Sequence, residues 1–222
     1  MLWANACNAA RRTRYFRPAS GSRQPMTQTV AAIIWAIGLL AWAAIRYPYQ
    51  RHARRIRVVS DSRSLTDRLA LGAATAGLAV IPIIYLSTGF PALANYVFRP
   101  WMGWVGLVVE LGFLLLFHAT HRQLGRNWSV SLEIRDDHRL VTDGLYRFVR
   151  HPMYSSFWLW AIAQAFLLPN WFAGLAGLAG VAIFYFARVG KEEDMMRAAF
   201  GKEYEAYAAR TGRVVPLFKR GD

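Results

Sequence analysis

The residues best suited to chemistry lie at one junction, where a polar segment ending at Arg150 meets the apolar stretch that begins at Pro152. Proline is favourable at the first position of a helix, because its missing N–H would have no partner there. The sequence therefore predicts a membrane helix that starts at Pro152, with His151 and Tyr154 at its water-facing mouth. A cation, an imidazole and a phenol gathered at a helix N-terminus suit a charged ligand.

A second polar pair, Arg188 and Glu192, closes the last apolar stretch. Their spacing of four residues places them on one face of a helix. An isolated pair of this kind can simply bond to each other and extend toward the lipid headgroups. Because the junction at Pro152 faces the same boundary, the two regions together bring aromatic, imidazole, cationic and anionic groups to one layer of the membrane.

The elements that position these groups are membrane helices. Of the 222 residues 55% are hydrophobic and 14% aromatic, and the apolar residues are bunched into long blocks. These features predict an all-α, polytopic membrane protein. Five spans are expected, at about Thr27–Ile45, Leu69–Leu86 (disturbed by Pro82), Trp101–Thr120, Pro152–Leu168 and Trp171–Val189.

Three regions follow from this pattern. Residues 1–26 are basic and contain no acidic residue, so we expect a disordered arm, and Met26 is an alternative start site. Residues 27–120 form a three-span N-terminal region. Residues 121–222 form a third region, which contains the candidate residues and is made of a polar loop, a two-span helical hairpin, and an amphipathic tail helix that begins near Lys191 and is interrupted at Gly201.

The hairpin turn is only Pro169-Asn170, and its second arm carries Gly174, Gly177 and Gly180. Small residues at this spacing let two helices approach closely in lipid. No strand precedes the glycines, as a nucleotide-binding fingerprint would require, so they indicate close packing.

The net charge is +14. The basic residues lie between apolar blocks, where the positive-inside rule and anionic headgroups explain them, so membrane lipid is the expected partner and nucleic acid is not. Seven arginines in 46–68 and six in 121–150, with one in 87–100, predict that these two basic loops and the C-terminus are cytoplasmic. The basic arm at 1–26 conflicts with this orientation.

No metal site is expected. Cys7 is the only cysteine, which excludes an intrachain disulfide and a cysteine-based metal site. His118 and His121 lie three residues apart without an evident third ligand. Glu110, inside the third span, is costly in lipid and is a functional candidate with no role assigned.

Residues 121–218 resemble the isoprenylcysteine carboxyl methyltransferase (ICMT) family and its relatives among the phospholipid methyltransferases. Four features match in order and spacing: His138-x-Leu-Val-x-x-Gly-x-Tyr146, then Arg150-His151-Pro152-x-Tyr154, a two-span hairpin, and Glu192-Glu193 followed by Phe200-Gly201-x-x-Tyr204-x-x-Tyr207. Two positions depart from the family. Ser155 stands where the family often has glycine, and the position near Ser131 stands where a member uses a glutamine on the cofactor.

The resemblance implies that S-adenosylmethionine is the cofactor and that a glutamate and an arginine, Glu192 and Arg188, act at the reaction site. It implies that Arg188 faces a substrate carboxylate. The cofactor-binding positions that it implies are His138, Arg139, Leu140, Val141, Tyr146, His151, Pro152, Met153, Tyr154 and Glu192.

The residue types suit this chemistry. Methyl transfer from a sulfonium is an in-line displacement that demands alignment and exclusion of water, and a carboxylate nucleophile needs no general base. Glu192 can accept hydrogen bonds from an amine or from ribose hydroxyls. Tyr146 and Tyr154 can face a sulfonium or pack on adenine, and the planar, permanently charged Arg188 suits an anionic head.

The methyl acceptor stays open at this point. A prenylated thiol carrying a carboxylate is the family's reference substrate, but an amine-bearing phospholipid or another membrane lipid also fits. Two other classes are alternatives: a membrane reductase of the sterol type, which would bind NADPH, and a non-enzymatic protein whose basic loops bind anionic lipid. The reductase predicts selective NADPH binding, and the lipid-binding protein predicts no effect of Glu192→Ala.

Overall fold

The computed structural model describes residues 26–53, 64–124 and 140–217. Over these residues the chain is helical and has no β-strand, which confirms the expected all-α class; two isolated β-bridges are present. The elements in order are α1 (Gln28–Ala53), α2 (Leu65–Thr75), the π-helix η1 (Ala76–Val80), α3 (Ile81–Thr88), η2 (Ala92–Ala94), α4 (Pro100–Leu124), η4 (Gly144–Arg147), α5 (Pro152–Leu167), α6 (Trp171–Phe200) and α7 (Lys202–Arg210).

Four segments of the described chain are long and apolar enough to cross a membrane: Gln28–Arg51, Leu65–Thr88, Pro100–Leu124 and Trp171–Phe200. The expected fifth span, α5, has 16 residues. At about 1.5 Å per residue it is roughly 24 Å long, against about 30 Å of hydrocarbon. Its status as a span therefore stays a prediction. The predicted basic arm falls on residues outside the described ranges except for Met26, which is buried against Gly103 of α4.

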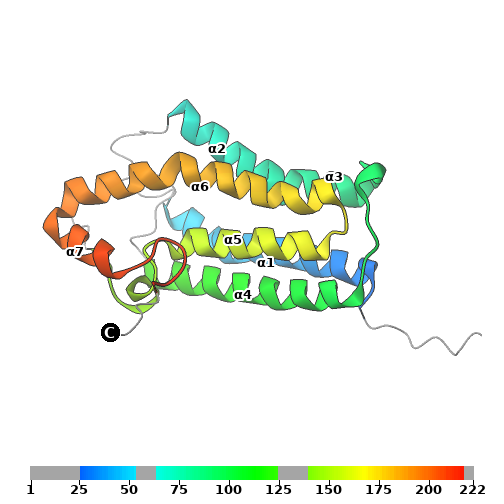
Figure 1. Ribbon diagram of the computed structural model, residues 1–222, viewed down its shortest axis with the longest axis horizontal. Coiled ribbons are helices and arrows are strands. Elements are labelled where there is room, and N and C mark those ends of the chain that lie inside the picture. The colour runs from blue at the N-terminus through cyan, green and yellow to red at the C-terminus, as the bar shows by residue number, and fades with distance from the viewer. Residues whose placement is uncertain (1–25, 54–63, 125–139, 218–222) are drawn as a thin grey trace, which may run out of the picture.

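The long helices lie side by side, and α7 lies at one end of the bundle (Figure 1). Helix α5 is the central element, because it packs against α1, α4, α6 and η1. A helix enclosed in this way must be apolar on nearly all of its faces. The sequence of α5, with five aromatic residues and no charged residue, meets that requirement.

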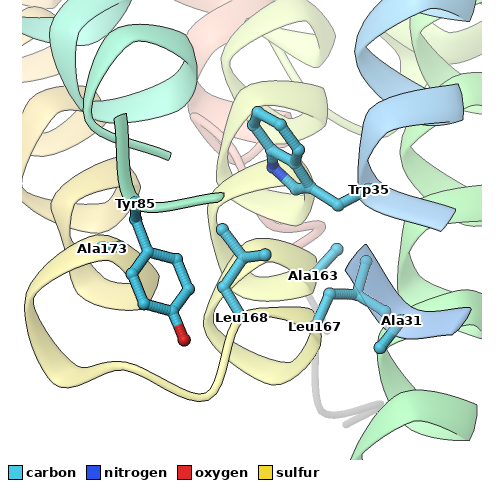
Figure 2. Packing of buried hydrophobic residues seen from close by; sticks show 7 residues of the cluster. All are labelled: Ala31, Trp35, Tyr85, Ala163, Leu167, Leu168 and Ala173. Carbon is cyan, nitrogen blue, oxygen red and sulfur yellow. The ribbon is translucent and has the colours of Figure 1, made fainter. Parts of the chain in front are cut away.

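One end of α5 is held by a cluster of buried apolar side chains from four helices. Figure 2 shows Leu168 between Tyr85 of α3 and the α1 residues Ala31 and Trp35. Leu167 and Leu168 are fully buried. The Pro169-Asn170 turn follows directly, and Asn170 caps α6 by accepting a hydrogen bond from the Ala173 N–H at 2.8 Å.

The glycines of α6 give the close packing that the sequence predicts: Gly180 packs against α2, Gly177 against η1 and α5, and Gly174 against the end of α5. A Cβ added at Gly180 would lie 2.5 Å from the Ala73 carbonyl oxygen. A Cβ added at Gly77 of η1 would lie 2.8 Å from the Ala176 carbonyl carbon. Both neighbours are backbone atoms and cannot move aside, so the two helices depend on small residues on both sides.

The disturbance expected at Pro82 takes the form of the π-helix η1, which immediately precedes α3. Proline has no N–H to continue the ladder of backbone hydrogen bonds. Gln164 of α5 stabilises this region, since its Nε2 donates to the Gly77 carbonyl at 2.9 Å and to the Ala173 carbonyl at 2.8 Å. Gln164 is fully buried and joins η1, α5 and α6.

Helix α6 differs from the expected tail. It continues unbroken through Gly190 and Lys191 to Phe200, because no proline interrupts it and Gly190 keeps a helical backbone, and it ends at Gly201, which has a positive φ of 51°. Its 30 residues span about 45 Å, some 15 Å more than the hydrocarbon layer. The helix is therefore long enough for its last three turns, which contain Glu192 and Glu193, to extend beyond the hydrocarbon layer.

Candidate cofactor and substrate site

The candidate site lies where α5 begins and where α6 leaves the apolar layer. Helix α5 starts at Pro152, as the sequence predicts, with His151 at the N-cap. Tyr154, in the first turn, is buried with 5% of its surface exposed, so the prediction that it lies at a water-facing mouth is wrong. The reason is the packing of α6, which places the rings of Phe184 and Tyr185 within 5.6 and 5.3 Å of the Tyr154 ring.

Glu192 is the point at which the predicted site residues converge. The Tyr154 hydroxyl donates a hydrogen bond to Glu192 Oε1 at 2.7 Å. The Arg188 Nε lies 3.5 Å from the same oxygen, and the His151 Nδ1 lies 3.6 Å from Oε2. Three residues singled out on sequence grounds, Tyr154, Arg188 and His151, therefore surround the carboxylate of a fourth.

Arg188 is held inside the protein and does not extend to the lipid headgroups. Its side chain is 12% exposed, and its guanidinium carbon lies 5.1 Å from the centre of the Phe184 ring. The Arg188 Nε and the His151 Nε2 are buried, and their nearest polar contacts among the described residues are long ones, each 3.5 Å from a carboxylate oxygen, of Glu192 and Glu193 respectively. Buried polar groups with only long contacts at one place can also bind a polar ligand.

The loop before α5 is fixed by a residue that sequence reasoning missed. Gln123, in the last turn of α4, donates from Nε2 to the Asp143 carbonyl at 2.6 Å and accepts from the Leu145 N–H at 2.9 Å. Gly144 has a φ of 54°, and a Cβ there would lie 2.7 Å from Gln123 Oε1. The conformation and the close approach both favour glycine, and this motif glycine was the available signal.

Tyr146 lies in η4, where its carbonyl accepts a hydrogen bond from the Tyr207 hydroxyl at 2.7 Å. Burial raises the pKa of the Tyr146 phenol well above its ordinary value, and the nearby Tyr207 and Glu192 raise it further. Burial likewise raises the pKa of Tyr207 to about 12. Both phenols are therefore neutral at physiological pH.

The end of the described chain, residues 211–217, runs across the start of α5, and we call it the strap. The Arg150 N–H donates to the Gly212 carbonyl at 2.8 Å, and the His151 N–H donates to the Arg213 carbonyl at 2.9 Å. The Ser155 hydroxyl donates to the Val214 carbonyl at 2.7 Å. Ser155, which departs from the family's common glycine, thus binds the strap.

Glu193 is a second residue whose role the sequence analysis did not identify. It is 1% exposed, and Arg150, Arg197 and Arg213 all direct guanidinium groups to its carboxylate. The sequence contained Glu193 in the Glu-Glu match, but only Glu192 was assigned a function.

The other predicted residues divide into three groups. His138, Arg139 and the position near Ser131 lie outside the described residues. Leu140 and Val141 are half-buried ahead of η4. Met153 packs on the apolar cluster that contains Phe113 and Trp160.

Glu110 lies apart from this site. It is 2% exposed in α4, its carboxylate fills the space left by Gly38 of α1, and neither oxygen has a hydrogen-bond partner among the described residues. Nothing in its surroundings links it to Glu192.

Fold and site together define a multi-pass helical membrane protein with a cluster of buried polar side chains at one end of its central helix. The sequence profile of the isoprenylcysteine carboxyl methyltransferase (ICMT) family matches residues 104–198. A probable protein-S-isoprenylcysteine O-methyltransferase from Oryza sativa subsp. indica is 32% identical over 132 residues, which cover 59% of this chain and 68% of that protein. The protein-S-isoprenylcysteine O-methyltransferase of Schizosaccharomyces pombe is 33% identical over 135 residues, 58% of this chain and 55% of that protein.

A solved structure of the eukaryotic intramembrane Ras methyltransferase ICMT also matches, with a TM-score of 0.51 and 25% identity over 83% of this chain. The match covers 63% of that solved chain, somewhat less than two thirds. The chain described here belongs to the isoprenylcysteine carboxyl methyltransferase family. It is accordingly a membrane methyltransferase.

Proposed function

We propose that this membrane methyltransferase uses S-adenosylmethionine to methylate the carboxylate of a lipophilic substrate of the prenylated cysteine type. The observation that carries the proposal is the convergence on Glu192 of the Tyr154 hydroxyl at 2.7 Å, with Arg188 and His151 within 3.6 Å. In this reaction the cofactor supplies a methyl group bonded to a sulfonium, which passes to a carboxylate oxygen and leaves S-adenosylhomocysteine.

The residues present fit such a cofactor. Glu192 carries a charged acceptor for an amine or for ribose hydroxyls, and Tyr154 orients it through a charge-assisted hydrogen bond. The neutral rings of Tyr146 and Tyr154 offer faces to a cation. The buried imidazole of His151, which makes only contacts of 3.5 and 3.6 Å with Glu193 and Glu192, lies beside this acceptor. We keep Pro152, which starts α5, and the positions His138, Arg139, Leu140, Val141 and Met153 as cofactor contacts that rest on the family resemblance.

The substrate assignment rests on Arg188. A buried, permanently charged guanidinium beside the apolar layer binds a carboxylate well, whereas it repels the protonated amine of a phospholipid. A carboxylate also needs no base before it attacks, and the described site provides alignment and shelter from water instead. The apolar chain of the substrate would remain in the bilayer. The basic loops at this end favour entry of the cofactor from the cytoplasm.

The first test is binding of S-adenosylhomocysteine to the full chain in detergent, measured by calorimetry. Glu192→Gln and Tyr154→Phe are expected to weaken binding by about tenfold or more, roughly 1.4 kcal/mol. Glu203→Gln serves as the control, because Glu203 is an exposed carboxylate of α7. The absence of binding by folded wild type, or selective binding of NADPH, would refute the proposal.

The second test addresses the substrate. Transfer of a labelled methyl group to a farnesylated cysteine with a free carboxylate is compared with transfer to the matching amide and to a phosphatidylethanolamine. Label on the carboxylate alone is expected, with Arg188→Lys raising the KM for the acceptor. Label on the phospholipid amine would support the N-methyltransferase alternative.

A further inference from the structure

The strap, residues 211–217, lies beyond the segment that matches the family profile, which ends at residue 198. It nevertheless touches the start of α5 at three successive points, through Arg150, His151 and Ser155. Two of these contacts are made by backbone N–H groups at the N-terminus of α5, where a helix has donors without intrahelical partners. The position of His151 therefore depends on a segment that comes sixty residues later in the sequence.

The strap is fastened by one buried carboxylate. Arg213 of the strap donates to Glu193 from Nε at 3.0 Å and from Nη2 at 2.7 Å, one nitrogen to each carboxylate oxygen. Arg150 donates to Glu193 Oε1 from Nε and Nη2, both at 3.2 Å. The Arg150 Nη1 also donates to the Ala208 carbonyl at 2.8 Å and to the Thr211 carbonyl, at the start of the strap.

His151 lies between the two neighbouring glutamates of α6. Its Nε2 is 3.5 Å from Glu193 Oε1, and its Nδ1 is 3.6 Å from Glu192 Oε2. A continuous set of contacts therefore runs from Arg213 through Glu193 and His151 to Glu192. Movement of the strap alters the placement of the imidazole beside the carboxylate that we assign to the cofactor.

We propose that Glu193 and Arg213 are positioning residues, which fasten the strap across the start of α5 and thereby hold His151 against Glu192. This inference rests on the proposed function, since it concerns the same cofactor site. Glu193 and Arg213 act through His151 and make no contact with the reacting groups themselves.

The structure provides a matched pair of arginines for the test. Arg213 and Arg197 are both about half exposed, and both contact Glu193 Oε2, at 2.7 and 3.5 Å. Only Arg213 belongs to the strap, whereas Arg197 lies on α6 and also bonds to Asp194. Because Arg150 still neutralises Glu193 after either change, both alanine variants are expected to fold.

The experiment measures binding of S-adenosylhomocysteine and steady-state methyl transfer for the full-length wild type, Arg213→Ala, Arg213→Lys and Arg197→Ala. Arg213→Ala is expected to raise the Kd and the KM for the cofactor about tenfold, with kcat changed much less. Arg213→Lys is expected to recover part of the loss, and Arg197→Ala is expected to match wild type. Glu193→Gln is expected to exceed the effect of Arg213→Ala, because it also leaves the buried Arg150 without a counter-charge.

The outcomes separate this inference from its alternatives. A purely structural role would lower the active fraction, so kcat would fall while the Kd and KM stayed constant, and the inference would be wrong. Equal binding by wild type and Arg213→Ala would also overturn it. If wild type itself fails to bind S-adenosylhomocysteine, the proposed function fails first, and this inference fails with it.

Discussion

The contact between Gly38 of α1 and Glu110 of α4 gives a sharp test of how the N-terminal helix is packed. A Cβ added at Gly38 would coincide with the Glu110 carboxylate, with Oε1 closest and Cδ at 2.6 Å. Glu110 is enclosed, so its side chain cannot swing into open space. Overpacking of this kind costs about 1–3 kcal/mol. Gly38→Ala is therefore expected to destabilise the protein by that amount.

The assay is a double-mutant cycle with Glu110→Ala, followed by thermal unfolding in detergent. For a chain of this size each kcal/mol lowers Tm by about 2–4 °C, so Gly38→Ala alone should lower Tm by roughly 2–12 °C. In the Glu110→Ala background the methyl group at position 38 has room, and the loss should largely vanish. Glu110→Gln serves as a control for charge, because it keeps the side-chain volume and should leave the Gly38→Ala penalty intact. Additive effects of Gly38→Ala and Glu110→Ala would refute the packing argument.

Three further predictions concern the helices around the site. Gly180→Ala should lower the free energy of unfolding by about 1–3 kcal/mol, because the added Cβ meets the α2 backbone. At Gly190, on the same helix, an added Cβ meets nothing within 4 Å, so Gly190→Ala should raise the free energy of unfolding by up to about 1 kcal/mol. Equal effects of the two variants in thermal unfolding would contradict the assigned helix interface. The pKa of Tyr207 is raised to about 12 by burial, so the unfolded chain loses this proton first, and stability should fall as pH rises from about 10 toward 12. Tyr207→Phe should show a smaller alkaline loss in pH-dependent unfolding, and an unchanged profile would count against that assignment. Gly144→Ala should weaken S-adenosylhomocysteine binding, because the positive φ and the close Gln123 side chain both disfavour a methyl group there, and unaltered affinity in calorimetry would show that the loop tolerates the change.

The sequence by itself determined most of the helices and several of their ends. Pro152 begins α5, the Pro169-Asn170 turn separates α5 from α6, and Gly201 ends α6. These features are local: proline and glycine act through their own backbone, and apolar periodicity acts within one helix. The spacing of Arg188 and Glu192 likewise predicted a shared helix face, and the two side chains do make contact.

Only the tertiary structure decided which faces meet. Tyr154 and Glu192 are 38 residues apart, and their hydrogen bond exists because α6 packs antiparallel to α5 at one particular depth. The glycines of α6 predicted a close neighbour, but whether that neighbour was α2 or α5 depended on how four helices share the space around α5.

The different surroundings of the two adjacent glutamates, Glu192 and Glu193, also depend on the tertiary structure. Residues 192 and 193 are chemically identical, but one turns toward Tyr154 and Arg188 while the other is enclosed by three arginines. Helix geometry sets the side chains of neighbouring residues about 100° apart, but it does not determine which groups each side chain meets. Arg213 of the strap contacts Glu193 from a distant part of the sequence, so no local sequence pattern could have revealed this contact.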